Sequence, residues 1–382
     1  MKLTLEREIL AKKLQSSIGA IGSSMIPILN EVLFQVKNNR LFITSSNGEV
    51  QLTVSMNCEF KGEEQSFVCD ARLFLTPVTT LKAKEVFLEV SEELVTLSTK
   101  RSSKYEAPII YESENYPVLN AKEWSDPLEI KGDTFSKMVK KSSMFVDKNN
   151  IRMAMRGLLM GTTGKTLTMQ SIASSGNIIC HLEALAPENT KFSEMKNVLL
   201  PKDTSNVAQE FEKSASISIS TDTEGKCIKI HDNMSTVILR LLEGKFPNCK
   251  PFIDSYAPEV NVKMLTEDIS LALKRAGGFS DEHGLTKIDM ESENIKIECD
   301  NTQFKRRATE EVTALYKSSE MSFTFGMNFK YLTKTLLTMS GENTFISMLG
   351  PKQQCYLSDD ASEGFNTLWI IAPMMLAKTV EK

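Results

Sequence analysis

Cysteine and histidine, the side chains that most often bind metals or act as nucleophiles and bases, are few and scattered in this chain. The 382 residues include seven cysteines and three histidines, and no two cysteines have the C-x-x-C spacing. An odd number of widely spaced cysteines indicates neither a zinc site nor a disulfide framework. We therefore expect no metal, no cofactor and a reducing cytoplasmic compartment.

Long apolar runs and a strong net charge are also missing. The longest apolar stretch, residues 368–377, is half as long as the ~20 residues that a membrane-spanning helix needs, and charged residues follow Met1 too soon for a signal peptide. The 45 basic and 49 acidic side chains give a formal charge of −4. This balance argues against tight nucleic-acid binding over the whole surface, because such affinity comes mainly from neutralising phosphates. It is compatible with a local basic patch.

Residues 161–166, Gly-Thr-Thr-Gly-Lys-Thr, resemble a phosphate-binding P-loop but depart from it in two ways. The motif needs a glycine five positions before the glycine of its Gly-Lys pair, where this chain has Leu159. A helix should also follow, whereas residues 167–172 have the pattern of a strand. We therefore predict a hairpin turn here and no nucleotide site.

The remaining polar residues do not form a recognisable catalytic set. His181, His231 and His283 lie in unrelated surroundings, without the neighbours of a proton relay. Asp359 and Asp360 are interpreted as an acidic turn between two strands. We predict a protein without catalytic activity; a hydrolase with an active site assembled from dispersed residues is the alternative from another class.

What the chain does contain is one order of elements that recurs three times, with a period of roughly 125 residues. In each repeat an amphipathic helix precedes a pair of strands, a further strand, a second helix and more strands. Six helices are expected, at residues 6–18, 71–81, 134–145, 202–211, 266–276 and 328–339. Strand pairs around polar turns are expected at 32–36 with 41–43, 158–160 with 167–169, and 288–290 with 295–297.

The composition, 41% hydrophobic and 25% charged, is that of a globular protein, and the length suits two or three domains. We predict the α+β class, with three domains of one architecture at residues 1–125, 126–251 and 252–382. Each domain should have two helices backed by a β-sheet.

The predicted helices are rich in basic residues, whereas acidic residues are commoner in the strands and turns. On a single helix this pattern usually indicates a solvated face. Its recurrence in three equivalent repeats predicts one concave basic surface, if the helices face inward along an arc, and such a surface attracts phosphates without reading bases. The candidate DNA-facing residues are Arg7, Lys12, Lys13, Arg72, Lys137, Lys140, Lys141, Lys202, Lys274, Arg275, Lys330 and Lys334.

The N-terminus resembles a known family. Residues 1–8, Met-Lys-Leu-Thr-Leu-Glu-Arg-Glu, and residues 26–29, Ile-Pro-Ile-Leu, look like the opening of the bacterial DNA polymerase III β subunit family. The later landmarks follow in the family's order: Tyr116-Pro117-Val118-Leu119, Asn150-Ile151-Arg152 with Gly157, Glu243-Gly244-Lys245-Phe246-Pro247, Asn328 with Tyr331, and residues 370–376, Ile-Ile-Ala-Pro-Met-Met-Leu. The resemblance covers essentially the whole chain.

This resemblance implies a DNA sliding clamp with the DNA-clamp fold. Two head-to-tail subunits would close a six-domain ring around duplex DNA, independent of sequence, and would tether the replicative polymerase and other DNA enzymes for processivity. A closed ring needs only weak, screened attraction to DNA, which reconciles an acidic chain with this role. A clamp loader and repair enzymes would bind through short linear peptides, in the cytoplasm, at the nucleoid and without a membrane. A clamp-like protein-binding scaffold without a replicative role is the alternative.

The resemblance also implies two further sets of residues. The partner-peptide pocket corresponds to Arg152, Met155, Ser174, Gly176, Ile179, Pro247, Asn328, Tyr331, Ile370, Ile371, Pro373, Met374 and Leu376. The dimer seam corresponds to Tyr105, Ala107 and Phe279. An apolar groove with a few polar groups and methionines suits a site that accepts many peptides.

Three positions depart from the family pattern. Residues 175–178, Ser-Gly-Asn-Ile, stand where Asp-Gly-His-Arg is common, and Ser23-Ser24 replaces an arginine before Pro27. Residues 377–382 extend past the usual terminal leucine. These differences bear on partner specificity and on one DNA contact.

Overall fold

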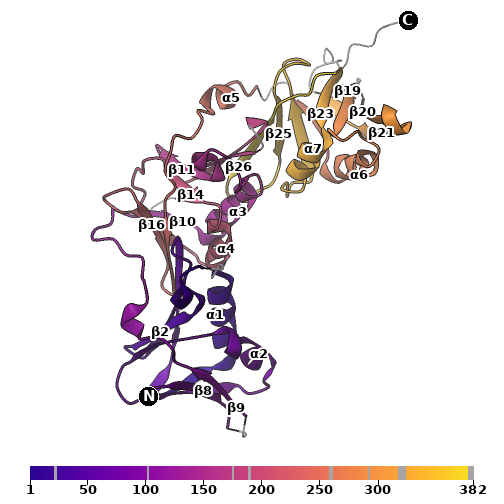
Figure 1. Ribbon diagram of the computed structural model, residues 1–382. Helices are drawn as coiled ribbons and strands as arrows, with labels where there is room; N and C mark the ends of the chain where they lie inside the picture. Colours follow the sequence, from indigo (N-terminus) through magenta and orange to yellow (C-terminus); the bar gives the residue numbers. More distant parts are fainter. Residues whose placement is uncertain are drawn as a thin grey trace, which may run out of the picture. The chain divides into compact units, whose positions relative to one another are not determined.

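The computed structural model describes residues 1–20, 24–100, 103–173, 176–187, 191–257, 261–290, 293–316 and 324–376. They form two compact units, one built from residues 1–140 and 186–242, the other from residues 141–185 and 243–382 (Figure 1). Ser23, Ser174, Ser175 and the extension at 377–382 lie outside the described residues. Within the described part of the chain, no helix is both long and apolar enough to cross a membrane.

The first unit contains two antiparallel sheets. The five-stranded sheet has the order β5 (Glu59–Lys61), β1 (Lys2–Glu6), β7 (Glu85–Val90), β8 (Leu94–Ser98) and β9 (Lys104–Pro108). The eight-stranded sheet has the order β10 (Leu128–Ile130), β15 (Ile217–Thr221), β16 (Cys227–His231), β17 (Ser235–Arg240), β4 (Val50–Asn57), β3 (Arg40–Ser46), β2 (Val32–Lys37) and β6 (Ser66–Cys69). The pairing of β17 with β4, at Val237 and Leu52, joins segments far apart in the sequence.

The helices of this unit are α1 (Arg7–Ala20), α2 (Arg72–Thr80), α3 (Gly132–Ser143), of which residues 141–143 belong to the second unit, and α4 (Thr204–Ala208). Strand β14 (Val198–Pro201) precedes α4. Short 3-10 turns lie at η1 (Pro27–Asn30), η2 (Ser113–Asn115) and η5 (Gln209–Phe211). Helix α1 packs on β3 and β4 and contacts both α2 and α4. Its Leu10 and Leu14, one turn apart, are each 1% exposed, as an amphipathic helix on a sheet requires.

The second unit repeats the combination of sheets and paired helices. Its larger sheet contains, in order, β11 (Gly157–Thr163), β12 (Thr166–Ala173), β13 (Ile178–Leu185), β26 (Asn366–Ile371), β25 (Cys355–Asp359), β24 (Asn343–Ser347), β18 (Asn261–Leu265) and β22 (Leu315–Tyr316). Its smaller sheet has the order β21 (Arg306–Thr313), β20 (Asn294–Asn301), β19 (Leu285–Met290) and β23 (Thr324–Asn328).

The helices of the second unit are α5 (Lys250–Asp254), α6 (Thr266–Gly277) and α7 (Phe329–Leu336), with 3-10 turns η3 (Met153–Arg156) and η6 (Thr302–Phe304). Helices α6 and α7 lie side by side, and α6 packs on β20 and β21. Trp369 on β26 is 0% exposed and is the largest fully buried side chain.

The hairpin predicted at residues 161–166 is confirmed. Strands β11 and β12 pair from Leu159–Gln170 to Thr163–Thr166, and Gly164 in the turn has φ +57°, a left-handed conformation that glycine adopts without steric cost. The segment that follows is a strand and not the helix of a P-loop.

All seven cysteines are free thiols; six are buried and Cys227 is half-buried. Burial raises the pKa of each of them, to about 11 for Cys249 and about 12 for Cys180. The thiols therefore stay protonated at neutral pH, which makes them poor nucleophiles.

Candidate functional site: basic helices and a partner site

The cations predicted to face DNA in the first unit lie on adjoining helices. Lys12 is exposed on α1, Arg72 on α2 and Lys140 on α3, and Lys202 is half-buried just before α4. Lys137 on α3 forms an ion pair of 2.9 Å with Asp133 one turn earlier. Because α1 contacts α2 and α4, much of this positive charge is concentrated on one group of helices.

Two of these cations also hold the first unit together. The Arg7 guanidinium donates hydrogen bonds to the carbonyl oxygens of Val78 (2.8 Å) and Ala83 (2.9 Å), which tie the start of α1 to the end of α2. The Lys13 ammonium lies 2.6 Å from Glu210, and both side chains are largely buried, at 15% and 12% exposed. Glu210 also accepts hydrogen bonds from the hydroxyls of Ser16 (2.6 Å) and Ser235 (2.9 Å), so α1 is joined to η5 by a network.

In the second unit the predicted DNA-facing residues differ in exposure. Lys274 on α6 and Lys330 on α7 are exposed, and Arg275 forms an ion pair of 2.6 Å with Glu310 on β21. The Lys334 ammonium lies 5.5 Å from the centre of the Phe145 ring. Lys141 is different: it is 7% exposed and forms an ion pair with Glu363 beside the Phe365 ring.

The residues predicted to bind partner peptides all belong to the second unit, apart from Ser174, which is outside the described residues. Strand β26 brings several of them together. Ile370 and Ile371 pair with Ile179 and Ile178 on β13, and all four are buried. The chain then leaves β26 beside the loop at Gly176, where the Ala372 N–H donates to the Asn177 carbonyl (2.9 Å).

The C-terminal segment, residues 372–376, is fixed by β23. The Met374 N–H donates to the Gly326 carbonyl (2.7 Å), which places half-buried Met374 and Leu376 beside this strand. A Cβ at position 326 would lie 2.6 Å from the Met374 carbonyl oxygen and 3.1 Å from a Leu376 methyl. Only glycine permits this approach, and Gly326 is a residue that the sequence prediction missed. A glycine inside a strand pattern is the signal that could have revealed it.

Asn328 begins α7 as its N-cap. Its side-chain oxygen accepts from the N–H groups of Lys330 (2.9 Å) and Tyr331 (3.3 Å), and its amide donates to the His283 carbonyl (2.7 Å). These bonds satisfy the free N–H groups of the helix start. They also fix the half-buried Tyr331 one turn into α7.

Arg152, Met155 and Pro247 form the remaining group of predicted peptide-binding residues. Arg152 is the exposed N-cap of η3 and Met155 is 4% exposed. A Cβ on Gly244 would lie 3.2 Å from the Ala154 Cβ, so the segment leading to half-buried Pro247 packs closely against η3. Because η3 also contacts β12, and β12 and β13 belong to the same sheet as β26, η3 lies against the sheet that contains β26.

The residues predicted for the dimer seam lie on both units. Tyr105 is 36% exposed on β9 and Phe279 is 42% exposed after α6, whereas Ala107 is 0% exposed within its own unit. Strand β9 is an edge of the five-stranded sheet and β21 is an edge of the four-stranded sheet.

Comparisons with known proteins agree with this architecture. Residues 1–120 match the family described as DNA polymerase III beta subunit, N-terminal domain. The beta sliding clamps of Haemophilus influenzae and Escherichia coli are 23% and 22% identical to this chain, each aligned over 98% of this chain and 100% of the relative. The DNA polymerase III β subunits of Pseudomonas aeruginosa (TM-score 0.86, 19% identity) and Thermotoga maritima (TM-score 0.84, 18% identity) superpose on 98% of this chain and on 100% of their own lengths.

The chain is thus similar to bacterial beta sliding clamps over nearly its whole length. The resemblance seen in the sequence and the predicted α+β clamp fold are therefore confirmed. The three domain boundaries, the peptide-binding residues, the DNA-facing residues and the seam remain predictions for this chain.

Proposed function

We propose that this chain is a non-catalytic DNA sliding clamp, in which two head-to-tail subunits form a ring around duplex DNA inside the cell. The observation that carries the proposal is the clamp fold over 98% of the chain, shared with clamps of several bacteria. Three domains per subunit, at 1–125, 126–251 and 252–382, would give the six domains of the ring. Ring closure would require a clamp loader to admit the DNA.

The basic helices support the interaction with DNA. Lys12, Lys140, Lys274 and Lys330 are exposed to solvent. Lys13 and Lys141 are instead largely buried in ion pairs inside their units. Exposed cations attract phosphates weakly at physiological salt, where charges are screened beyond about 8 Å. Weak contacts of this kind keep a ring centred on DNA without stopping it from sliding.

The edge strands support ring closure. One subunit presents β9 at the edge of one sheet and β21 at the edge of another. The N–H and C=O groups at the edge of a sheet can form hydrogen bonds with a strand of another chain. Identical subunits that contact each other through two different surfaces are related by a rotation. They form a ring when a whole number of these rotations completes a full turn. Exposed Tyr105 and Phe279 would add apolar contacts at this seam.

The C-terminal segment and its neighbours support a site for partner peptides of the replicative polymerase, the clamp loader and repair enzymes. Half-buried Pro373, Met374 and Leu376 lie next to β23, and Met375 is 82% exposed. Partly exposed apolar side chains beside fixed polar groups suit a short linear peptide. Asn177 in place of the family's usual histidine alters one polar group beside this site.

The test is retention on DNA of different topology. The labelled protein is loaded by a bacterial clamp loader onto a nicked circular DNA, freed of loader and separated from unbound protein by gel filtration. We expect it to stay with the circle and to be lost when a restriction enzyme linearises the DNA. Equal retention on both DNAs would contradict a topological link, and no retention on either would favour a scaffold without a replicative role.

A further inference from the structure

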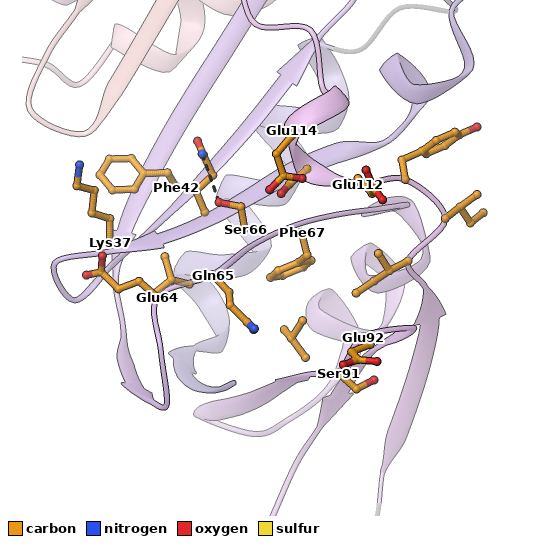
Figure 2. Close-up of a pocket in the computed structure, with 17 residues that line it drawn as sticks. Lys37, Phe42, Glu64, Gln65, Ser66, Phe67, Ser91, Glu92, Glu112 and Glu114 are labelled. Atoms are coloured by element: carbon orange, nitrogen blue, oxygen red, sulfur yellow. Dashed lines mark hydrogen bonds between the residues drawn. The ribbon is translucent and has the colours of Figure 1, made fainter.

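The first unit contains a cleft of about 1060 Å³, whereas the residues proposed for the partner site belong to the second unit. It follows the strand β6 and the residues just before it, between the segment 109–114 and residues 90–92 at the end of β7 (Figure 2). Its apolar surface includes Phe67, which is 3% exposed, and Ile110, which is 67% exposed. We refer to it below as the β6 cleft.

The charged side chains that line the β6 cleft are mostly acidic. Glu64, Glu92, Glu112 and Glu114 line it, and Lys37 is its one cation. All four glutamates are exposed, and among the residues that the structure describes none of them forms an ion pair with a lysine or arginine. Figure 2 shows Glu112 and Glu114 on one side of Ser66 and Glu92 on the other. The cleft therefore attracts a positively charged ligand and repels phosphate groups.

The edge of β6 offers backbone hydrogen bonds to such a ligand. The Val36 N–H donates to the Gln65 carbonyl (3.0 Å), and Gln35 is paired with Ser66. In an antiparallel ladder, residues that exchange both bonds alternate with residues that exchange none. The N–H and C=O of Ser66 therefore point away from β2, and Ser66 is exposed at the edge of the eight-stranded sheet.

These features describe one kind of ligand. An extended peptide can add to a free strand edge through its backbone, with alternate side chains on either side. Positively charged side chains would meet the glutamates, and apolar ones would meet Ile110 and the surface above Phe67. We propose that the β6 cleft docks an extended, basic segment of a partner protein, as a second docking site in addition to the partner site of the second unit.

The test uses the full-length protein and a fluorescein-labelled decapeptide of alternating lysine and valine, followed by fluorescence anisotropy. A decapeptide of alternating glutamate and valine is the matched probe. We expect the lysine peptide to bind, to bind less tightly as salt is raised, and to bind at least about tenfold more tightly than the glutamate peptide. Equal affinity for the two peptides would overturn the proposal.

Two triple variants locate the binding. Glu64→Gln, Glu112→Gln and Glu114→Gln together should weaken binding of the lysine peptide about tenfold or more. The control combines Glu6→Gln, Glu123→Gln and Glu212→Gln, exposed glutamates of the same unit outside the cleft, and removes the same total charge. Equal losses in the two variants would mean that only net charge matters, and would reject the β6 cleft.

A third pair tests strand addition. Ser66→Pro removes the outward N–H, which is outside the β2–β6 ladder, whereas Ser66→Ala keeps it. We expect weaker binding for the proline variant alone, with an unchanged circular dichroism spectrum. Equal binding by a folded Ser66→Pro and Ser66→Ala would overturn backbone pairing; should the proline variant fail to fold, the glutamate variants still decide the proposal.

Discussion

Lys141 and Glu363 form an ion pair that is nearly removed from water, with side chains 9% and 15% exposed. Two buried charges are costly to desolvate, and removal of one partner leaves the other without compensation. The Lys141 ammonium also lies 5.4 Å from the Phe365 ring centre, which adds a favourable contact for the cation. Replacement of either partner alone should therefore destabilise the second unit.

We predict that Glu363→Gln lowers the unfolding free energy of the second unit by about 3–5 kcal/mol. The two tryptophans make this measurable, because Trp124 belongs to the first unit and Trp369 to the second. Urea unfolding followed by fluorescence in a Trp124→Phe background reports Trp369 alone. The control Asp254→Asn breaks the exposed pair with Lys250 and should cost at most about 0.5 kcal/mol; equal effects would contradict the buried-pair argument.

His231 on β16 gives the first unit a pH dependence. Desolvation by burial lowers its pKa below the ordinary 6.5, and Lys229 lowers it further, against a smaller opposing effect of Asp232. Between 6.5 and this lowered pKa the unfolded chain binds more protons than the folded chain. The unfolding free energy contributed by His231 is thus present above pH 6.5 and is lost as pH falls toward the folded pKa.

We expect His231→Gln to reduce the loss of stability between about pH 7.5 and about pH 5.5. The measurement is urea unfolding followed by Trp124 fluorescence at both pH values. His283→Gln, a substitution in the second unit, is the control and should leave the loss in the first unit unchanged. A wild-type pH slope retained in His231→Gln would count against this assignment.

At the scale of elements, Gly326 on β23 determines where the C-terminal segment lies. The close approach of Met374 and Leu376 leaves no room for a Cβ. Overpacking at such a position costs about 1–3 kcal/mol, and the segment can escape the clash by moving away from β23. The proposed partner site would then lose its geometry while the sheets remain.

We predict that Gly326→Val weakens binding of a fluorescein-labelled peptide from the cognate polymerase by about tenfold or more. Fluorescence anisotropy measures this affinity. Gly350→Ala is the matched control, because a Cβ there meets nothing within 4 Å, and it should bind like the wild type. Unchanged binding by Gly326→Val would reject the placement of the peptide at this segment.

Helices and hairpins were predictable because the spacing of apolar residues that indicates each of them lies within a short segment of the sequence. The helix expected at 266–276 is α6, Thr266–Gly277, and the one expected at 202–211 is α4 followed by η5. The burial of Lys141 and the bridge from Met374 to Gly326 were not predictable, because each depends on residues more than 40 positions away. The same holds for the β6 cleft, which is lined by five separate stretches of the chain.

At the scale of the whole molecule, the predicted seam would determine whether two subunits close into a ring. Tyr105 and Phe279 are aromatic side chains exposed on different units. An interface buries such anchors, and a few of them carry most of its binding energy.

We predict that Tyr105→Ala with Phe279→Ala shifts the solution mass from two subunits toward one at micromolar concentration. Loss of two anchors of about 2 kcal/mol each weakens association roughly a thousandfold. Sedimentation velocity measures the mass. The control Leu185→Ala with Leu337→Ala removes exposed side chains elsewhere and should remain dimeric, whereas a monomeric control or an unaltered seam variant would contradict this assignment.

The shielded thiols have a practical consequence for studying ring opening. Since burial raises the pKa of every native cysteine, reagents that attack thiolates will react first with a cysteine introduced at an exposed position. A cysteine pair introduced at exposed positions beside Tyr105 and Phe279, which keeps both aromatic side chains and is bridged by a bifunctional maleimide, would close the proposed ring covalently without first deleting any native cysteine. A covalently closed ring could reach DNA only by sliding over a free end. Comparison with the unlinked protein would therefore distinguish entry over a DNA end from loading by a clamp loader.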